Sequence, residues 1–125
     1  MILVDTSVWI EFFRVREPFY SAVRVLLENR QAVTIECVFA ELMQGAKTPR
    51  ERRLILEMWE SLPKVDEAGL LLQAGQTAGQ HRWPERGIGL VDSWIVAAAK
   101  RAGAQVWTLD KKIKSILNTS ESFSL

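Results

Sequence analysis

Hydrophobic and polar positions follow two different periods along this chain, and the changes of period indicate its elements. Short apolar runs at 2–4, 33–35 and 105–109 predict strands, with weaker candidates around Val65 and Phe123. Between them, apolar residues recur at helical spacing and predict helices over 6–13, 18–29, 38–46, 49–62, 67–80, 90–102 and 111–117. We therefore expect an α/β fold with a central, mainly parallel sheet of four to five strands and helices on both faces.

Length and composition restrict the number of domains and the cellular compartment that we expect for this chain. The chain has 125 residues, enough for one domain over 1–125 that needs no disulfides. Its single cysteine, Cys37, lies in an apolar stretch and is expected to be a small buried residue rather than a reactive thiol. No apolar run approaches the roughly 18 residues of a membrane span. A cytoplasmic protein, neither secreted nor inserted in a membrane, is the expectation.

Four carboxylates stand in separate segments of the chain: Asp5, Glu41, Asp92 and Asp110. Asp5 and Asp110 follow expected strands, and in parallel sheets functional groups collect beyond the carboxyl ends of the strands. A cluster of anions is stable only if a cation joins it, and oxygen ligands suit Mg²⁺ or Mn²⁺. The chain has one histidine and one cysteine, too few for a typical zinc site.

An ordinary structural role remains open for each aspartate, because any of the three could cap the N-terminus of a helix. That alternative does not explain Glu41, which is expected within a helix. It also does not require the Ser and Thr residues beside two of the acids, in 5–7 and 108–110.

Oxygen-ligated metal sites most often carry out phosphoryl transfer, in which the metal activates a nucleophile. The chain has no Gly-rich loop ending in Lys and Ser or Thr for a nucleoside triphosphate. Asp5 is not followed two residues later by a second aspartate, which disfavours a phosphate-accepting aspartate. Hydrolysis by activated water is the favoured chemistry.

Four segments in order, at 2–10, 40–46, 91–99 and 108–110, resemble the PIN-domain family, in particular the VapC-type ribonuclease toxins of type II toxin–antitoxin systems. The resemblance implies a PIN fold and Mg²⁺- or Mn²⁺-dependent endonucleolytic cleavage of RNA. Asp5 and Asp92 match the principal metal-binding aspartates, Glu41 the family glutamate, and Asp110 the acid after the late strand. Ser7 falls where the family often places a hydroxyl that helps to arrange the site.

One departure from the family pattern follows the last acid. Many relatives carry a further aspartate and phenylalanine there, whereas this chain has Lys112 and Ile113. The departure motivates an alternative function, a catalytically weak PIN-like binding module that engages an arginine-bearing partner through its acidic pocket. Basic residues near the expected site are candidates to bind RNA phosphates, with ordinary solvated surface as the alternative: Arg82, Arg86, Lys111, Lys112 and Lys114.

By the same resemblance, the partners are a cognate antitoxin, which inserts a segment into an apolar groove, and a second copy in a homodimer. Trp9, Phe12 and Phe13 are candidates to line that groove. Simple core packing is the alternative, because Trp9 and Phe13 are four residues apart on a helix. Trp83, in the loop with Arg82 and Arg86, is a candidate to stack on RNA bases.

Overall fold

A computed structural model describes all residues, 1–125, and its centre is a small parallel sheet. The strands β1 (Ile2–Val4), β2 (Ala32–Val33) and β3 (Gln105–Trp107) pair in the order β2-β1-β3, and both pairings are parallel. Single parallel bridges extend it, from Thr34 to Lys64 on one side and from Val106 to Ser122 on the other. The two weak strands expected around Val65 and Phe123 are therefore reduced to one bridge each, and three strands remain.

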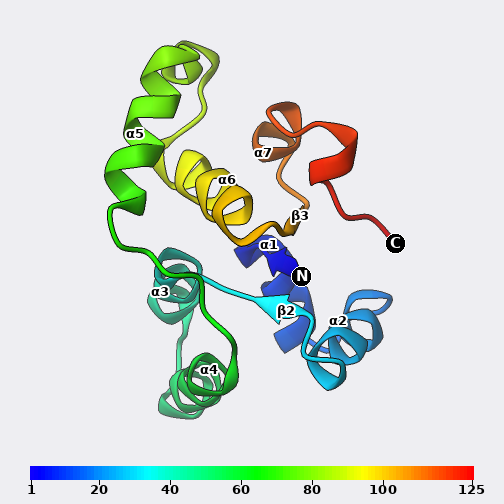
Figure 1. Cartoon of the computed structure of the whole chain (residues 1–125). Coiled ribbons are helices and arrows are strands. Elements are labelled where there is room, and N and C mark those ends of the chain that lie inside the picture. The colour runs from blue at the N-terminus through cyan, green and yellow to red at the C-terminus, as the bar shows by residue number, and fades with distance from the viewer.

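Seven helices surround the sheet, and their positions confirm the helical periods in the sequence. They are α1 (Thr6–Phe13), α2 (Phe19–Glu28), α3 (Glu36–Gly45), α4 (Pro49–Ser61), α5 (Leu70–Gln80), α6 (Leu90–Ala102) and α7 (Lys111–Ser115). Two short 3-10 helices, η1 (Trp83–Arg86) and η2 (Thr119–Glu121), complete the chain. In Figure 1, α6 lies to one side of the strands and α2 to the other.

The largest difference between an expected and an observed helix start is at α5. The α5 helix begins at Leu70 rather than at position 67, because Gly69 adopts a φ of 69°, a left-handed conformation that interrupts a helix. The residues before it form an irregular segment that includes Glu67. In that segment, the Glu67 carboxylate lies between α3 and α6.

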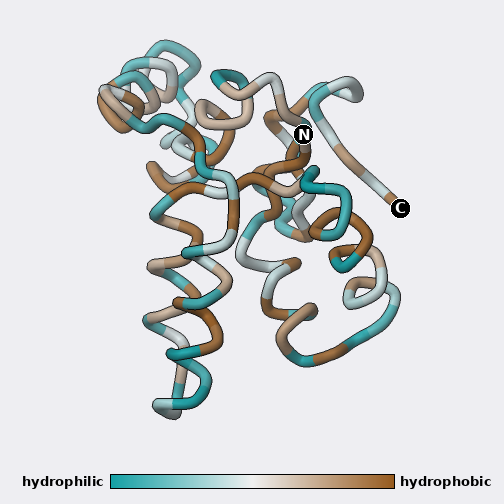
Figure 2. The backbone as a smooth tube through the Cα atoms, turned by 60° about the horizontal axis from the view of Figure 1, so that its bottom comes forward, coloured by the Kyte–Doolittle hydropathy of each residue, from teal (hydrophilic) through white to brown (hydrophobic).

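The hydrophobic core is built around β1, whose three residues are all buried. Both faces of this central strand are covered, which explains why it is a continuous apolar run rather than an alternating one. Hydrophobic stretches run through the middle of the molecule in Figure 2, and hydrophilic ones gather at outer turns. None of the helices has the length and apolar character needed to cross a membrane.

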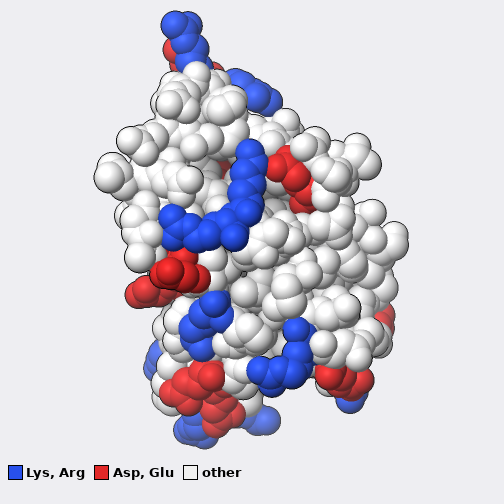
Figure 3. Space-filling model, in the orientation of Figure 1, with Lys and Arg blue, Asp and Glu red and all other residues white.

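On the face seen in Figure 3, acidic and basic side chains are interspersed among neutral ones, and no single-sign patch covers it. This agrees with the near balance of 16 basic and 15 acidic residues. Charge separation must therefore be sought in local clusters rather than in the molecule as a whole.

Truncation of Leu3, which is fully buried in β1, should lower the free energy of unfolding by about 3 kcal/mol because it leaves a cavity in the core. Leu56→Ala, on the exposed side of α4, should change it by no more than about 0.5 kcal/mol. Urea denaturation of Leu3→Ala and Leu56→Ala measures both. Equal losses at the two positions would show that β1 is not the centre of the core.

Candidate active site

The Asp5 carboxylate lies where β1 ends and α1 begins, and only 4% of this residue is exposed. Its Oδ2 atom accepts hydrogen bonds from Ser7 Oγ (2.9 Å) and Thr108 Oγ1 (2.7 Å). Its Oδ1 atom accepts no hydrogen bond from the protein and is not sealed from solvent. Although Asp5 occupies the N-cap position of α1, its side chain makes no capping bond, so the capping alternative fails for this residue.

Both hydroxyls that hold Asp5 are themselves held by backbone groups of the turn after β3. Asp110 N donates to Thr108 Oγ1 and Leu109 N donates to Ser7 Oγ, each at 2.9 Å. Each hydroxyl thus accepts a hydrogen bond from a backbone N–H and donates one to the Asp5 carboxylate. The sequence prediction for Ser7 agrees with this geometry, whereas Thr108 was noted beside Asp110 without being assigned a role.

Asp110 caps the N-terminus of α7, which is the structural role left open for each aspartate in the sequence. Its Oδ1 atom accepts from the backbone N–H groups of Lys112 (2.7 Å) and Ile113 (3.3 Å) at the start of α7. The other carboxylate oxygen accepts no hydrogen bond from the protein. Capping therefore engages one oxygen and leaves the second available to a ligand.

Asp92, in the first turn of α6, is half-buried, and its Oδ2 atom accepts a hydrogen bond from Gly89 N (3.0 Å). Burial raises the pKa of Asp92, and the Gly89 N–H acts in the opposite direction. The carboxylates of Asp110 and Asp5 raise this pKa further, while Lys112 lowers it. Three of the predicted acids are thus close enough to repel one another.

Glu41 is exposed on α3 and joins the cluster from another side. Its Oε1 atom accepts a hydrogen bond from Thr6 Oγ1 (2.9 Å), which ties it to the residue after Asp5. Burial, followed by the charges of Glu41, Glu67 and Asp5, raises the pKa of the Cys37 thiol to about 12. Cys37 therefore stays protonated at neutral pH and is a buried, unreactive side chain, as expected from the sequence.

The donor set suits a hard divalent cation in chemistry, because it consists of carboxylate oxygens from four separate segments. As the side chains stand, no three His, Cys, Asp or Glu residues are grouped closely enough to hold an ion. The charges of Asp5 and Asp110 both act on Asp92. Glu41 is linked by a hydrogen bond to Thr6, the residue after Asp5. Binding of an ion would require rotation of these side chains.

Sequence reasoning missed a fifth acid, Glu67. Its Oε2 atom accepts from Glu36 N (2.8 Å) at the start of α3, and its Oε1 atom accepts from Trp94 Nε1 (3.1 Å) on α6. Glu67 therefore joins the two helices that carry Glu41 and Asp92. An acid just before a helix gives no sequence signal of such a bridge.

The predicted basic residues are exposed, and most of them meet at one edge of the acidic cluster. Lys111, Lys112 and Lys114 lie on α7, and Arg86 donates from its guanidinium to Ser115 Oγ at 3.5 Å. The Lys112 ammonium lies above Gly87, 3.9 Å from the place a Cβ atom would take there. Arg82 lies at the opposite end of η1 and makes no contact of this kind.

Two aromatic predictions need correction. Trp9 is fully buried and packs edge-on against Phe12 and Phe39, so it supports the surface from below and cannot line a groove. Trp83 is also buried and stacks on His81, which removes it as a platform for RNA bases. Helical spacing had indicated an apolar face for Trp9 without showing how deeply it is covered, and Trp83 had been placed in a loop.

Phe12 and Phe13 do reach a surface hollow. They line it together with Val15, Tyr20, Leu54 and Met58, between α1, the start of α2 and α4. This hollow adjoins a second pocket that also contains Phe13 and Leu54 and extends to Glu41. An apolar surface therefore leads from the outside of α4 towards the acidic cluster.

Comparison with known proteins gives one family. The PIN domain profile matches residues 2–117. Ribonuclease VapC32 of Mycobacterium tuberculosis is 34% identical over 119 residues, which cover 92% of this chain and 89% of that protein.

Two solved structures share the fold. One is VapBC2 from Rickettsia felis bound to a DNA fragment from their promoter, with a TM-score of 0.71, 21% identity and coverage of 93% of both chains. The other is a toxin–antitoxin complex from Klebsiella pneumoniae, with a TM-score of 0.75, 17% identity and coverage of 98% of this chain and 100% of that one. They support the parallel sheet flanked by helices.

The raised pKa of Asp92 predicts a pH-dependent stability in the absence of metal. A carboxyl whose folded pKa is raised costs no stability while it is protonated in both states, and the cost develops as pH rises through the ordinary value of 3.8. Asp92→Asn should therefore have a higher Tm than the parent at neutral pH, and the gap should vanish below that value. Thermal unfolding followed by circular dichroism in a chelating buffer measures it.

The matched control is Glu60→Gln, which removes one exposed charge from α4 without touching the cluster. It should produce no comparable gap at neutral pH. A gap for Asp92→Asn that persists unchanged in acid would mean that the ionisation of Asp92 is not its cause.

Proposed function

This chain belongs to the PIN domain family as a VapC-type protein, and from that premise we propose that it is a metal-dependent endoribonuclease, the toxin of a type II toxin–antitoxin pair. The observation that carries the proposal is the Asp5 carboxylate, held through one oxygen by Ser7 and Thr108 while the other remains accessible. A capping aspartate would accept backbone N–H groups at the start of α1, and Asp5 does not.

The residues proposed to hold Mg²⁺ or Mn²⁺ are Asp5, Glu41, Asp92 and Asp110. Burial first, and then the nearby carboxylates of Asp110 and Asp5, raise the pKa of Asp92, and a divalent cation would offset this cost of the charged form. When bound at such a site, a divalent cation activates water and neutralises charge that develops on the leaving oxygen. Ser7 and Thr108 then serve to orient Asp5, and Glu67 to hold α3 beside α6.

RNA is the proposed substrate, and its backbone needs cations outside the acidic cluster. Arg86 and the lysines of α7 adjoin Asp110 and Asp92 and are proposed to bind phosphates there. Arg82 is a weaker candidate because its place at the start of η1 does not bring it to α7. The sequence departure at Lys112 therefore adds a positive charge beside the acids instead of a further carboxylate.

The proposed protein partner is a cognate antitoxin, which binds the apolar hollow lined by Phe12, Phe13, Tyr20, Leu54 and Met58. Support comes from the position of this hollow, which continues through Phe13 and Leu54 towards Glu41. A segment lying there could cover the route to the acidic cluster. Relatives in complexes named as toxin–antitoxin assemblies make such a partner the natural expectation.

A homodimer is part of the proposal. Large apolar side chains are exposed on α5 and at the start of α6, namely Leu71, Leu72, Leu90 and Val91. The two helices pack closely, because a Cβ atom added at Gly75 would lie only 4.0 Å from Leu90 Cδ1. A second copy seated on this surface would remove these side chains from water.

The catalytic proposal predicts that the purified protein cleaves structured RNA with Mg²⁺ or Mn²⁺ and stops when a chelator is added. Asp5→Ala and Asp92→Asn should lower the cleavage rate at least about 100-fold, because each removes a ligand of the activating ion. Thr108→Val, which removes the hydroxyl that donates to Asp5 and accepts from Asp110 N, should lower it about tenfold. Single-turnover cleavage of a labelled RNA gives these rates.

Glu60→Gln on the exposed side of α4 is the control and should cleave like the parent. If Asp5→Ala and Asp92→Asn cleave as fast as Glu60→Gln, the site assignment is wrong. A chain that binds an arginine-bearing partner but shows no metal-dependent cleavage would support the binding-module alternative.

The antitoxin proposal predicts different effects at two leucines of α4 that are equally exposed, at 46%. Leu54→Asp places a charge in the hollow and should weaken binding of the cognate antitoxin at least about 100-fold, since a desolvated unpaired charge costs several kcal/mol. Leu56→Asp lies outside the hollow and should bind normally. Calorimetric titration measures both, and equal affinities would exclude this hollow as the antitoxin surface.

A further inference from the structure

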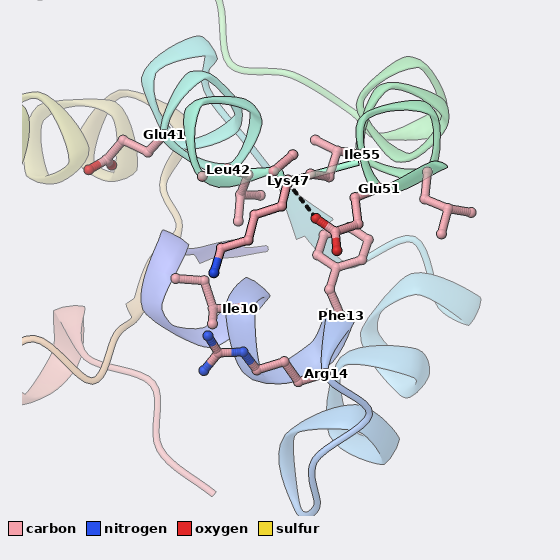
Figure 4. Close-up of a pocket in the computed structure, with 11 residues that line it drawn as sticks. Ile10, Phe13, Arg14, Glu41, Leu42, Lys47, Glu51 and Ile55 are labelled. Atoms are coloured by element: carbon pink, nitrogen blue, oxygen red, sulfur yellow. Dashed lines mark hydrogen bonds between the residues drawn. The ribbon is translucent and has the colours of Figure 1, made fainter. Parts of the chain in front are cut away.

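A pocket of about 460 Å³ lies beside Glu41, enclosed by α1, α3 and α4 (Figure 4). Its floor is apolar, with Ile10, Phe13, Leu42 and Ile55 among the lining residues. Its volume is within the range of pockets that hold small ligands or parts of larger ones. Because Glu41 belongs both to this pocket and to the acidic cluster, the two sites are adjacent.

Two cations lie at the rim of this pocket. Arg14 follows the last residue of α1, and Lys47 lies in the connection between α3 and α4. In Figure 4 the Lys47 ammonium and the Arg14 guanidinium lie on the same side of the pocket, with Ile10 between them. Two positive groups thus face one small region of the surface.

Neither cation is neutralised by the protein. The ion pairs of the chain join Arg16 to Glu11, Arg24 to Glu28 and Lys100 to Glu121, and none involves Arg14 or Lys47. The rim therefore carries two cations without an ion-pair partner, above an apolar floor.

Glu41 and Glu51 line the same pocket but form no ion pair with these cations. Glu51 accepts the backbone N–H of Lys47 at 2.7 Å, and Glu41 accepts the hydroxyl of Thr6. Figure 4 shows the Glu41 carboxylate directed away from Arg14 and Lys47. An external anion can therefore bind the two cations without displacing an existing ion pair.

We propose that this pocket binds one nucleotide of single-stranded RNA, with a backbone phosphate between Arg14 and Lys47 and the base against Ile10 and Phe13. The inference deepens the proposed ribonuclease function, on which it rests. A phosphodiester supplies an anion that both cations can bind, and an unstacked base supplies a flat apolar group for the floor. Sequence-predicted RNA contacts did not include either cation.

The position of the pocket explains how a polyanion can approach an acidic cluster that repels it. Arg86 and Lys112 adjoin Asp92 and Asp110, whereas Arg14 and Lys47 adjoin Glu41. An RNA strand that crosses the carboxylates would therefore meet cations before and after them. With Trp83 buried, the floor of this pocket offers an apolar surface beside Glu41 on which a base could rest.

The test measures binding of a short fluorescein-labelled single-stranded RNA to the full chain by fluorescence polarisation, in chelator so that the probe stays intact. Arg14→Ala and Lys47→Ala should each weaken binding about five- to tenfold at low salt, and each should reduce the slope of log K against log salt by about 0.7. Ile10→Ala should weaken binding without changing the slope, because an apolar contact releases no counterions. Arg53→Ala, an exposed cation of α4 outside the pocket, should match the parent.

Several results would overturn the inference. One is an unchanged salt slope in Arg14→Ala and Lys47→Ala, and another is a parent chain that does not bind the RNA at all. If these variants bind RNA normally but lose affinity for the antitoxin, the cations belong to the protein interface instead.

A parallel cleavage assay with Mn²⁺ separates this inference from the function on which it rests. If the parent cleaves RNA but the salt slopes do not change, the ribonuclease assignment stands and the nucleotide pocket falls. If the slopes change as expected but no cleavage occurs, the RNA pocket stands and the catalytic proposal falls.

Discussion

The burial of the Asp5 carboxylate at the end of the central strand is the constraint on which the arrangement of the site depends. A charged group in this position is costly unless hydrogen bonds satisfy it, and Ser7 and Thr108 supply them. Those hydroxyls are in turn fixed by the backbone at positions 109 and 110. The turn that carries Asp110 is therefore bound to the turn that carries Asp5, and the parallel pairing of β1 with β3 keeps the two side by side.

In the proposed site, structural and metal-binding roles fall on the same side chains. Asp110 caps α7 with one oxygen, and Asp92 binds the backbone of Gly89 with one of its own. Each leaves a second oxygen for a ligand, so capping and metal binding do not compete. The side chains of Arg14 and Lys47 form no ion pair within the protein, although they line the same pocket as Glu41.

Local signals in the sequence predicted most of the elements. Apolar spacing and the Pro49 start predicted α4, and Gly103 marked the end of α6, because these signals act within one or two helical turns. The edge strands were overestimated, since pairing at an edge depends on contacts with a distant segment. The same limit explains Trp9, whose helical spacing indicated an apolar face but not that Phe12, Phe13 and Phe39 would enclose it.

By itself the sequence determined the fold class, the four acids and the hydroxyls beside two of them, because residue type and local spacing are sufficient for these. Only the tertiary structure decided that Thr108, 103 residues from Asp5, would donate to its carboxylate, and that Glu67 would bridge α3 and α6. It also decided that Arg14 and Lys47 would share one pocket. Such contacts join residues far apart in the chain, and their distances are set by how the helices pack around β1.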